Sequence, residues 1–219
     1  NFLPAHASLR GRDYVVYQAQ NNSIGPSTFQ LWLRASAASG RFTAPPVALT
    51  TYGERAGGVE VGAEAFDNQR PHLLALADRL ALVWERRQAS APRQIYYMEL
   101  SADGLPLRPE GAAAGDPPYR RIIENPYDCL FPQTFVLRDQ LSVMWFDNRR
   151  GDNHIFVAQR EGAVWRERDL SARLAGASTY PWFVEGRGAA GVIWESRQGN
   201  RSRLVIGTPD QAVEAPRIF

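Results

Sequence analysis

Short apolar runs alternate with polar turn residues along the whole chain. Residues 80–84 and 141–145 are largely apolar runs of strand length, and each follows a turn signal centred on an aspartate, Asp78 or Asp139. Another apolar run precedes each turn. Runs this short, bounded by turn residues, are typical of strands buried on both faces, and no copy offers the roughly ten residues of helical periodicity that a helix needs. The pattern predicts an all-β fold built of hairpins.

A triplet of positions recurs with constant internal spacing. A proline is followed seven residues later by aspartate or glycine, and six residues after that by tryptophan or tyrosine. The four copies are Pro4, Gly11 and Tyr17; Pro71, Asp78 and Trp84; Pro132, Asp139 and Trp145; and Pro181, Gly188 and Trp194. The first residue of a strand need not donate to the ladder, so each proline is expected at the head of a strand. The tryptophans are expected to be buried between sheets.

Two further strands are expected in each copy. The third strands fall at residues 29–33, 95–97, 155–157 and 204–206, and weaker fourth strands at 42–50, 105–108, 165–170 and 212–219. Four short antiparallel strands per unit, repeated about every 50 to 60 residues, are typical of the blades of a β-propeller. The prediction is one β-propeller domain over residues 1–219, with units at 1–66, 67–128, 129–177 and 178–219. It either closes with four blades or forms part of a larger propeller.

The third copy carries the clearest family pattern. Its segment from Trp145 to Phe156, with Asp147, Arg149 and Gly151 at fixed offsets, resembles the W-x-D-x-R-x-G…I-Y repeat of bacterial sialidase-like (BNR-type) propellers. Residues 84–87 with 95–96, and residues 194–199, are similar. The Asp-box of true sialidases, S-x-D-x-G-x-x-W, is absent. The resemblance therefore implies a repeat type and its blade architecture, and not by itself an enzyme.

In three copies the aromatic residue is followed by an acid and then, two residues later, by an arginine. These pairs are Glu85 and Arg87, Asp147 and Arg149, and Glu195 and Arg197. Arginine and carboxylate can pair in a bidentate geometry that braces a hairpin tip. A feature that recurs in every good copy serves the architecture more often than a ligand, so these residues are expected to be structural ion pairs.

Residues that break the repeat are better candidates for a ligand site. The beginnings of the first strands and the tips after the second strands are expected on one face, at the entrance of the central channel. The candidates there are His6, Arg70, His72, Tyr127, Phe131, Gln133, Tyr180 and Trp182. A long insertion at 116–128 is expected to add aromatic and charged residues to the same rim, because loops longer than about twelve residues are usually functional or disordered.

Composition narrows the classes of function. Every one of the 25 basic residues is arginine, the acids are interspersed among them, and the formal charge is only +2, so nucleic-acid binding is not expected. The single cysteine, Cys129, permits no intrachain disulfide, and the three scattered histidines show no metal-ligand spacing. We therefore expect no cofactor and no metal. No apolar run approaches the length of a membrane span, so membrane insertion is not expected either.

Two functional hypotheses remain. The first is a non-catalytic recognition module, exported to the periplasm, cell surface or medium, that binds a peptide, protein or glycan on the channel face. The alternative is a sialidase-like glycan-processing enzyme, or a fragment of one. A glycosidase commonly needs a positioned carboxylate pair, and the visible carboxylates are mostly explained by the repeat. A second copy, or further blades from additional sequence, is expected to cover exposed blade faces.

Overall fold

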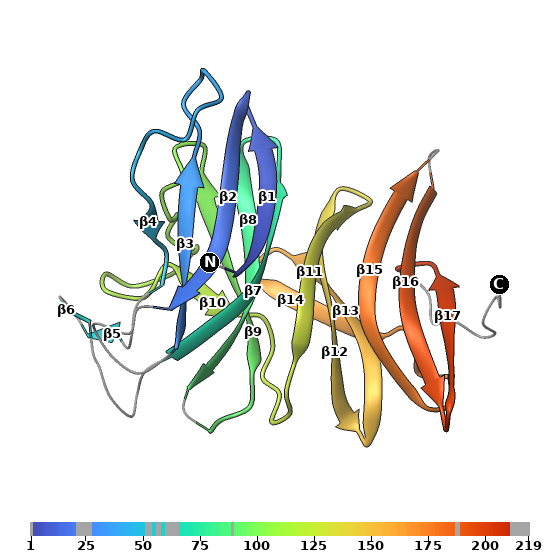
Figure 1. Ribbon diagram of the computed structural model, residues 1–219. Helices are drawn as coiled ribbons and strands as arrows, with labels where there is room; N and C mark the ends of the chain where they lie inside the picture. Colours follow the sequence, from blue (N-terminus) through green and yellow to red (C-terminus); the bar gives the residue numbers. More distant parts are fainter. Residues whose placement is uncertain are drawn as a thin grey trace. The chain divides into compact units, whose positions relative to one another are not determined.

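The computed structural model describes residues 2–20, 28–50, 54–55, 58–59, 66–88, 90–186 and 189–210. All regular secondary structure in these residues is β-strand, as Figure 1 shows. Within the same ranges no helix could cross a membrane. The chain divides into two compact units, Asn1–Ile122 and Ile123–Phe219, and each is considered by itself below.

The first unit holds two four-stranded antiparallel sheets. One runs in chain order through β1 (Phe2–Leu9), β2 (Arg12–Gln20), β3 (Phe29–Ala35) and β4 (Val47–Ala48). The other is formed by β7 (Phe66–Ala75), β8 (Arg79–Gln88), β9 (Gln94–Ser101) and β10 (Tyr119–Arg121). A short ladder of β5 (Glu54–Arg55) and β6 (Gly58–Val59) lies between them in sequence.

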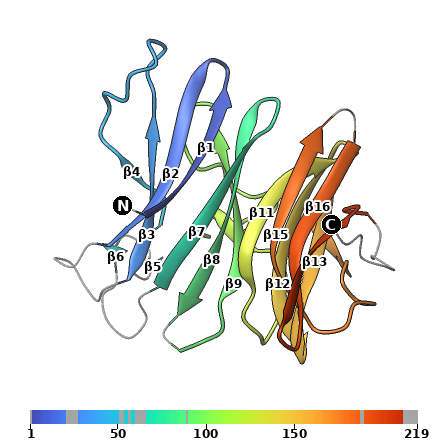
Figure 2. The same ribbon diagram turned by 45° about the vertical axis from the view of Figure 1, so that its right-hand side comes forward.

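The second unit continues the same meander. Its first sheet contains β11 (Leu130–Leu137), β12 (Gln140–Arg150), β13 (Asp152–Glu161) and β14 (Val164–Asp169). Its last sheet contains β15 (Ala177–Gly186), β16 (Ala189–Gln198) and β17 (Arg201–Gly207), seen in orange and red in Figure 2. The strand expected over residues 212–219 lies outside the described residues. The all-β prediction is confirmed.

The repeated tryptophans are buried. Trp84 and Trp145 have no exposed surface, and Trp194 is 1% exposed, so the predicted burial of all three is confirmed. In the first unit, Trp84 joins a cluster of leucines from both sheets. In the second unit, Trp194 packs in a cluster that includes Met144 and Ile155 of the neighbouring sheet. Each core is therefore the interface between two sheets, as the buried apolar runs require.

The repeat prolines do not stand at the heads of their strands. β7 begins at Phe66, well before Pro71, and β15 begins at Ala177, before Pro181. In each of the four larger sheets the register shifts at the proline, between Phe2 and Ala5, Gln69 and His72, Leu130 and Gln133, and Thr179 and Trp182. A β-bulge interrupts the ladder there, so the missing N–H of proline leaves no gap in the hydrogen bonding. The expected head position was wrong because a bulge tolerates proline equally well.

Part of the insertion at 116–128 belongs to a sheet edge. The fourth strand expected at 105–108 is reduced to one bridge, Leu100 to Pro106, and β10 takes the outer position instead. Tyr119 pairs with Met98 and is 6% exposed, and its ring meets Trp84 edge-on at 5.6 Å between centroids. The prediction that this whole insertion lines a ligand rim is corrected for Tyr119, because its ring fills the core.

Candidate functional site

The residue before each repeat proline has a left-handed backbone. The φ angles are 48° at Leu3, 51° at Arg70, 56° at Phe131 and 54° at Tyr180. A bulky residue in this region costs on the order of 1 kcal/mol or more, and a following proline ordinarily pushes its neighbour towards extended backbone. Strain of this kind clusters at ligand sites, and bulges re-aim side chains. These four, called the pre-proline residues, are therefore the primary candidates for a site.

In the second and third copies a direct contact joins the pre-proline residue to the strand residue that follows the repeat aromatic. Nη1 of Arg70 is 2.8 Å from Oε2 of Glu85. At the corresponding positions of the second unit, Phe131 stacks on Phe146 with ring centroids 5.6 Å apart. We call the residues after the repeat aromatics the rim partners; they are Gln18, Glu85, Phe146 and Glu195.

Within each unit a rim partner also contacts the pre-proline residue of the next sheet. In the first unit, Oε1 of Gln18 accepts a hydrogen bond of 2.7 Å from the backbone N–H of Arg70. In the second unit, Tyr180 meets Phe146 edge-on at 5.6 Å and Phe131 at 4.8 Å. The rim of the first unit is therefore polar, whereas that of the second unit is an aromatic cluster.

The acid of the second copy has a different partner from the one expected. Glu85 has a side chain 1% exposed and pairs with Arg70 and, at 3.5 Å, with Arg93. Arg87 lies 3.6 Å from Asp67, the residue opposite it in the ladder. Directly opposed residues are about 5 Å apart, whereas residues two apart on one extended strand are separated by nearly 7 Å. The expected link from Glu85 to Arg87 is thus replaced by cross-strand pairing.

Asp147 and Arg149 do form an ion pair, at 2.7 Å, and the Asp147 side chain has no exposed surface. Asp147 also accepts hydrogen bonds from Nε1 of Trp145 at 2.8 Å and from Nδ2 of Asn125 at 3.0 Å. A register shift between Asp147 and Arg150 brings the two residues together despite their spacing along the strand. Burial, with the Asp147 charge, raises the pKa of the neighbouring Cys129 thiol, so this cysteine is not a poised nucleophile.

The fourth copy lacks the pair altogether. Nε of Arg197 donates to the carbonyl of Gly199 at 3.3 Å. Glu195 is half-buried and makes no ion pair with any residue that the structure describes. The recurrence of acid and arginine in the sequence therefore does not correspond to one recurring contact.

Two further candidates are largely withdrawn into the fold. Gln133 is 8% exposed, and its Oε1 accepts a hydrogen bond of 3.2 Å from the N–H of Phe183, so it ties β11 to β15. His72 is half-buried, and burial lowers its pKa to about 4, which keeps the ring neutral near neutral pH.

Three candidates lie outside the aromatic cluster. Tyr127 is 43% exposed, and its N–H donates to Oδ1 of Asn125 at 3.0 Å. Trp182 is 61% exposed and opposes Ile193 in the ladder, with no ring contact to another described aromatic. His6 lies 3.0 Å from Asp13 on the first sheet. Two of the predicted candidates, Phe131 and Tyr180, thus contact each other and Phe146, which the sequence analysis did not name.

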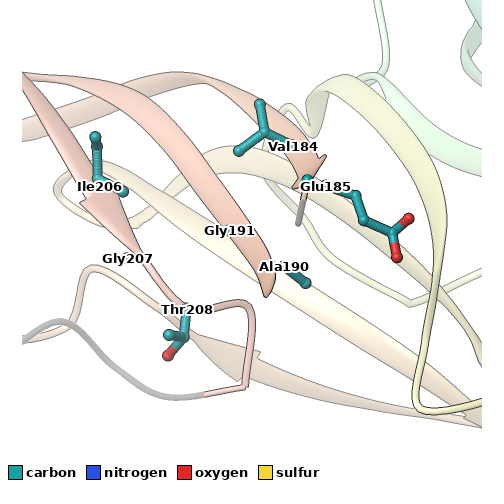
Figure 3. A pocket seen from close by; sticks show the side chains of 8 residues that line it. Val184, Glu185, Ala190, Gly191, Ile206, Gly207 and Thr208 are labelled. Carbon is teal, nitrogen blue, oxygen red and sulfur yellow. The ribbon is translucent and has the colours of Figure 1, made fainter. Parts of the chain in front are cut away.

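A pocket lies on the last sheet (Figure 3). It is lined by Val184, Glu185, Gly186, Ala190, Gly191, Ile206, Gly207 and Thr208. Four residues of extended strand separate Tyr180 from Val184, about 13 Å, so the pocket is distinct from the aromatic rim. One acid lines it, and within the described ranges no group of three acidic, histidine or cysteine side chains is placed to hold a metal.

Comparison with known proteins shows similarity in structure alone. No family model matches the chain, and no curated protein matches it in sequence. An α-L-arabinofuranosidase from Lactobacillus brevis is 13% identical to this chain, with a TM-score of 0.55. The match covers 97% of this chain and 72% of the arabinofuranosidase chain. A family 117 glycoside hydrolase from Zobellia galactanivorans is 12% identical, with a TM-score of 0.56. That match covers 99% of this chain and 68% of the hydrolase chain. A family 43 β-1,3-galactosidase is 10% identical, with a TM-score of 0.57. That match covers 93% of this chain and 72% of the galactosidase chain.

At such low sequence identity, the structural similarity is evidence about the fold alone. The sheets of this chain are the blades of a β-propeller, as predicted. All three similar structures are named as glycoside hydrolases.

Proposed function

We propose that this protein binds glycans through the aromatic rim of its second unit and does not hydrolyse them. The observation that supports this proposal most strongly is the residue types found at the four pre-proline positions. The strained bulges aim Leu3, Arg70, Phe131 and Tyr180, and none of the four is a carboxylate. Binding sites for small ligands are typically lined by apolar and aromatic side chains with a few placed polar groups, which is the character of the cluster around Phe131 and Tyr180.

The state of two of the three repeat acids, Glu85 and Asp147, supports binding over hydrolysis. Glycosidases use two carboxyl groups about 5 to 10 Å apart that flank the scissile bond. The side chains of Glu85 and Asp147 are 1% and 0% exposed, and both are paired with arginine. Carboxylates held in this way do not reach a glycosidic oxygen or a water molecule. The second candidate, a glycoside hydrolase, is favoured by the activities for which the similar structures are named.

The proposal keeps three expectations from the sequence. The sialidase-like repeat type of residues 145–156 stays a prediction, and a glycan ligand is compatible with it and with the similar structures. Export to the periplasm, cell surface or medium would place the protein where glycans are met. Trp182 and Leu204, 61% and 53% exposed on the last sheet, favour cover by a second copy or further blades.

The test measures binding and hydrolysis in the same samples. Arabino-, xylo- and β-1,3-galacto-oligosaccharides are titrated calorimetrically, and the sugars are then analysed by chromatography. We expect binding of at least one series with the sugar recovered intact. The double variant Phe131→Ala/Tyr180→Ala should lose that binding, whereas Phe42→Ala, an exposed aromatic of the first unit, should retain it. Released products, or unchanged binding in the double variant, would contradict the proposal. If the protein binds a protein or a peptide and no glycan, the proposed glycan ligand is wrong and the ligand belongs to one of those two classes.

A further inference from the structure

The rim partners of the described sheets differ in how fully they are occupied. Gln18 accepts the N–H of Arg70, and the buried Glu85 is neutralised by Arg70 and Arg93. Phe146 is 4% exposed and packs against the rings of both Phe131 and Tyr180. Three of the four rim partners are therefore committed to contacts inside the protein.

Glu195 is the exception. It is half-buried at the same ladder position, opposite Thr179 on β15 and Leu204 on β17. The neighbouring arginine, Arg197, donates to a backbone carbonyl, and Glu195 has no ion pair among the residues described. Glu195 is the residue after the repeat aromatic. In the second and third copies the residue at this place contacts the pre-proline residue, as Glu85 contacts Arg70 and Phe146 contacts Phe131.

The pre-proline residue of this sheet is Tyr180, which follows Thr179, the ladder partner of Glu195. Its ring is held edge-on by Phe131 and Phe146 and remains 46% exposed. The aromatic cluster thus ends in an accessible ring on the residue after Thr179, and Thr179 is the ladder partner of Glu195, a carboxylate with no ion pair to the residues described. A carboxylate at neutral pH is an acceptor only, with two oxygens that accept charge-assisted hydrogen bonds from hydroxyl groups.

We infer that Glu195 is a specificity-determining residue, whose carboxylate accepts hydrogen bonds from the hydroxyls of a neutral sugar lying against Tyr180. The inference rests on the proposed function and deepens it by naming the ligand class. Sugars carrying a carboxylate are disfavoured, because a second negative charge would lie close to Glu195 with no described cation to offset it. The site therefore selects neutral glycans over uronates.

The test compares Glu195→Gln with Glu185→Gln, which makes the same charge change at an exposed acid of the same sheet. The calorimetric probes are arabinotriose, xylotriose, β-1,3-galactotriose and trigalacturonic acid. Wild type should bind a neutral trisaccharide in preference to trigalacturonate. Glu195→Gln should weaken the neutral interaction about tenfold, the loss expected for one charge-assisted hydrogen bond, and should narrow the preference. Glu185→Gln should change neither.

The outcomes separate this inference from the proposed function. Neutral binding that Tyr180→Ala weakens but Glu195→Gln leaves unchanged would overturn the role of Glu195 and leave the glycan site standing. A preference of wild type for trigalacturonate would overturn the ligand class. If no probe binds wild type, the proposed function itself fails. Thermal melting of each variant shows that loss of binding does not reflect loss of fold.

Discussion

The guanidinium of Arg70 lies 2.8 Å from the buried carboxylate of Glu85. The same two positions of the third sheet hold Phe131 and Phe146, which stack ring on ring. A bulge of the same kind thus brings a pre-proline residue onto its rim partner whether the contact is ionic or apolar. Backbone register, rather than residue type, determines the geometry of the rim.

The Arg70–Glu85 pair should be strongly coupled. Arg70→Met removes one of the two described arginine partners of a buried carboxylate and is expected to cost about 2 to 4 kcal/mol in the free energy of unfolding. The double variant Arg70→Met/Glu85→Met imitates the apolar contact of Phe131 with Phe146, so it should cost less than the two single variants together. Urea denaturation of the four proteins gives the coupling energy. Strictly additive losses would show that the pair is not a unit.

Asp147 should be more important to stability than its surface-like sequence context suggests. Asp147→Ala removes the acceptor of Trp145, Asn125 and Arg149 at a site with 1% exposure. We expect a loss of about 3 to 5 kcal/mol, because buried donors and a cation are left without their acceptor. Asp152→Ala, at an exposed acid of the adjoining strand, should change stability by less than about 0.5 kcal/mol. Similar melting temperatures for the two variants would contradict this interpretation.

The sequence predicted the strands and buried tryptophans well, because the apolar runs and the proline–aromatic spacing are local signals. It was less informative about contacts. Asp147 lies two residues after Trp145 and shares its sheet face, whereas Glu85 follows Trp84 directly and projects from the other face. Because side chains alternate between the two faces of a strand, counting residues from each tryptophan could have predicted that Asp147 and Glu85 lie on different faces. The left-handed pre-proline residues could not be foreseen, since proline normally disfavours that conformation in its neighbour.

Two aspartates that share a repeat position should respond differently to glycine. Asp139 follows Arg138 in a two-residue hairpin turn with φ angles of 61° and 51°, whereas Asp78 has no positive φ. Asp139→Gly relieves the left-handed conformation and should stabilise the protein by about 0.5 to 1 kcal/mol. Asp78→Gly adds only freedom to the unfolded chain and should destabilise it slightly. Equal shifts in the urea midpoint would show that the two turns do not differ in this way.

His72 should make stability depend on pH in the mildly acidic range. Burial lowers its folded-state pKa to about 4, against 6.5 for the free side chain. Between these values the unfolded chain binds more protons, so the free energy of unfolding falls as pH drops from about 6.5 towards 4. His72→Gln should flatten this dependence in urea midpoints measured at pH 7 and 4.5. His6→Gln, at a side chain 58% exposed, serves as the control, and identical pH profiles for wild type and His72→Gln would contradict the argument.

Hydrogen–deuterium exchange with and without a saturating neutral trisaccharide tests the central claim most directly. If glycans bind at the aromatic rim, the amides around the bulges at 130–133 and 179–182, and the strand at 145–147, should become protected. Residues 190–191 and 206–208, in the pocket of Figure 3, should exchange as in the free protein. Protection confined to that pocket, with exchange at the bulges unchanged, would show that the strained pre-proline residues are not the binding site.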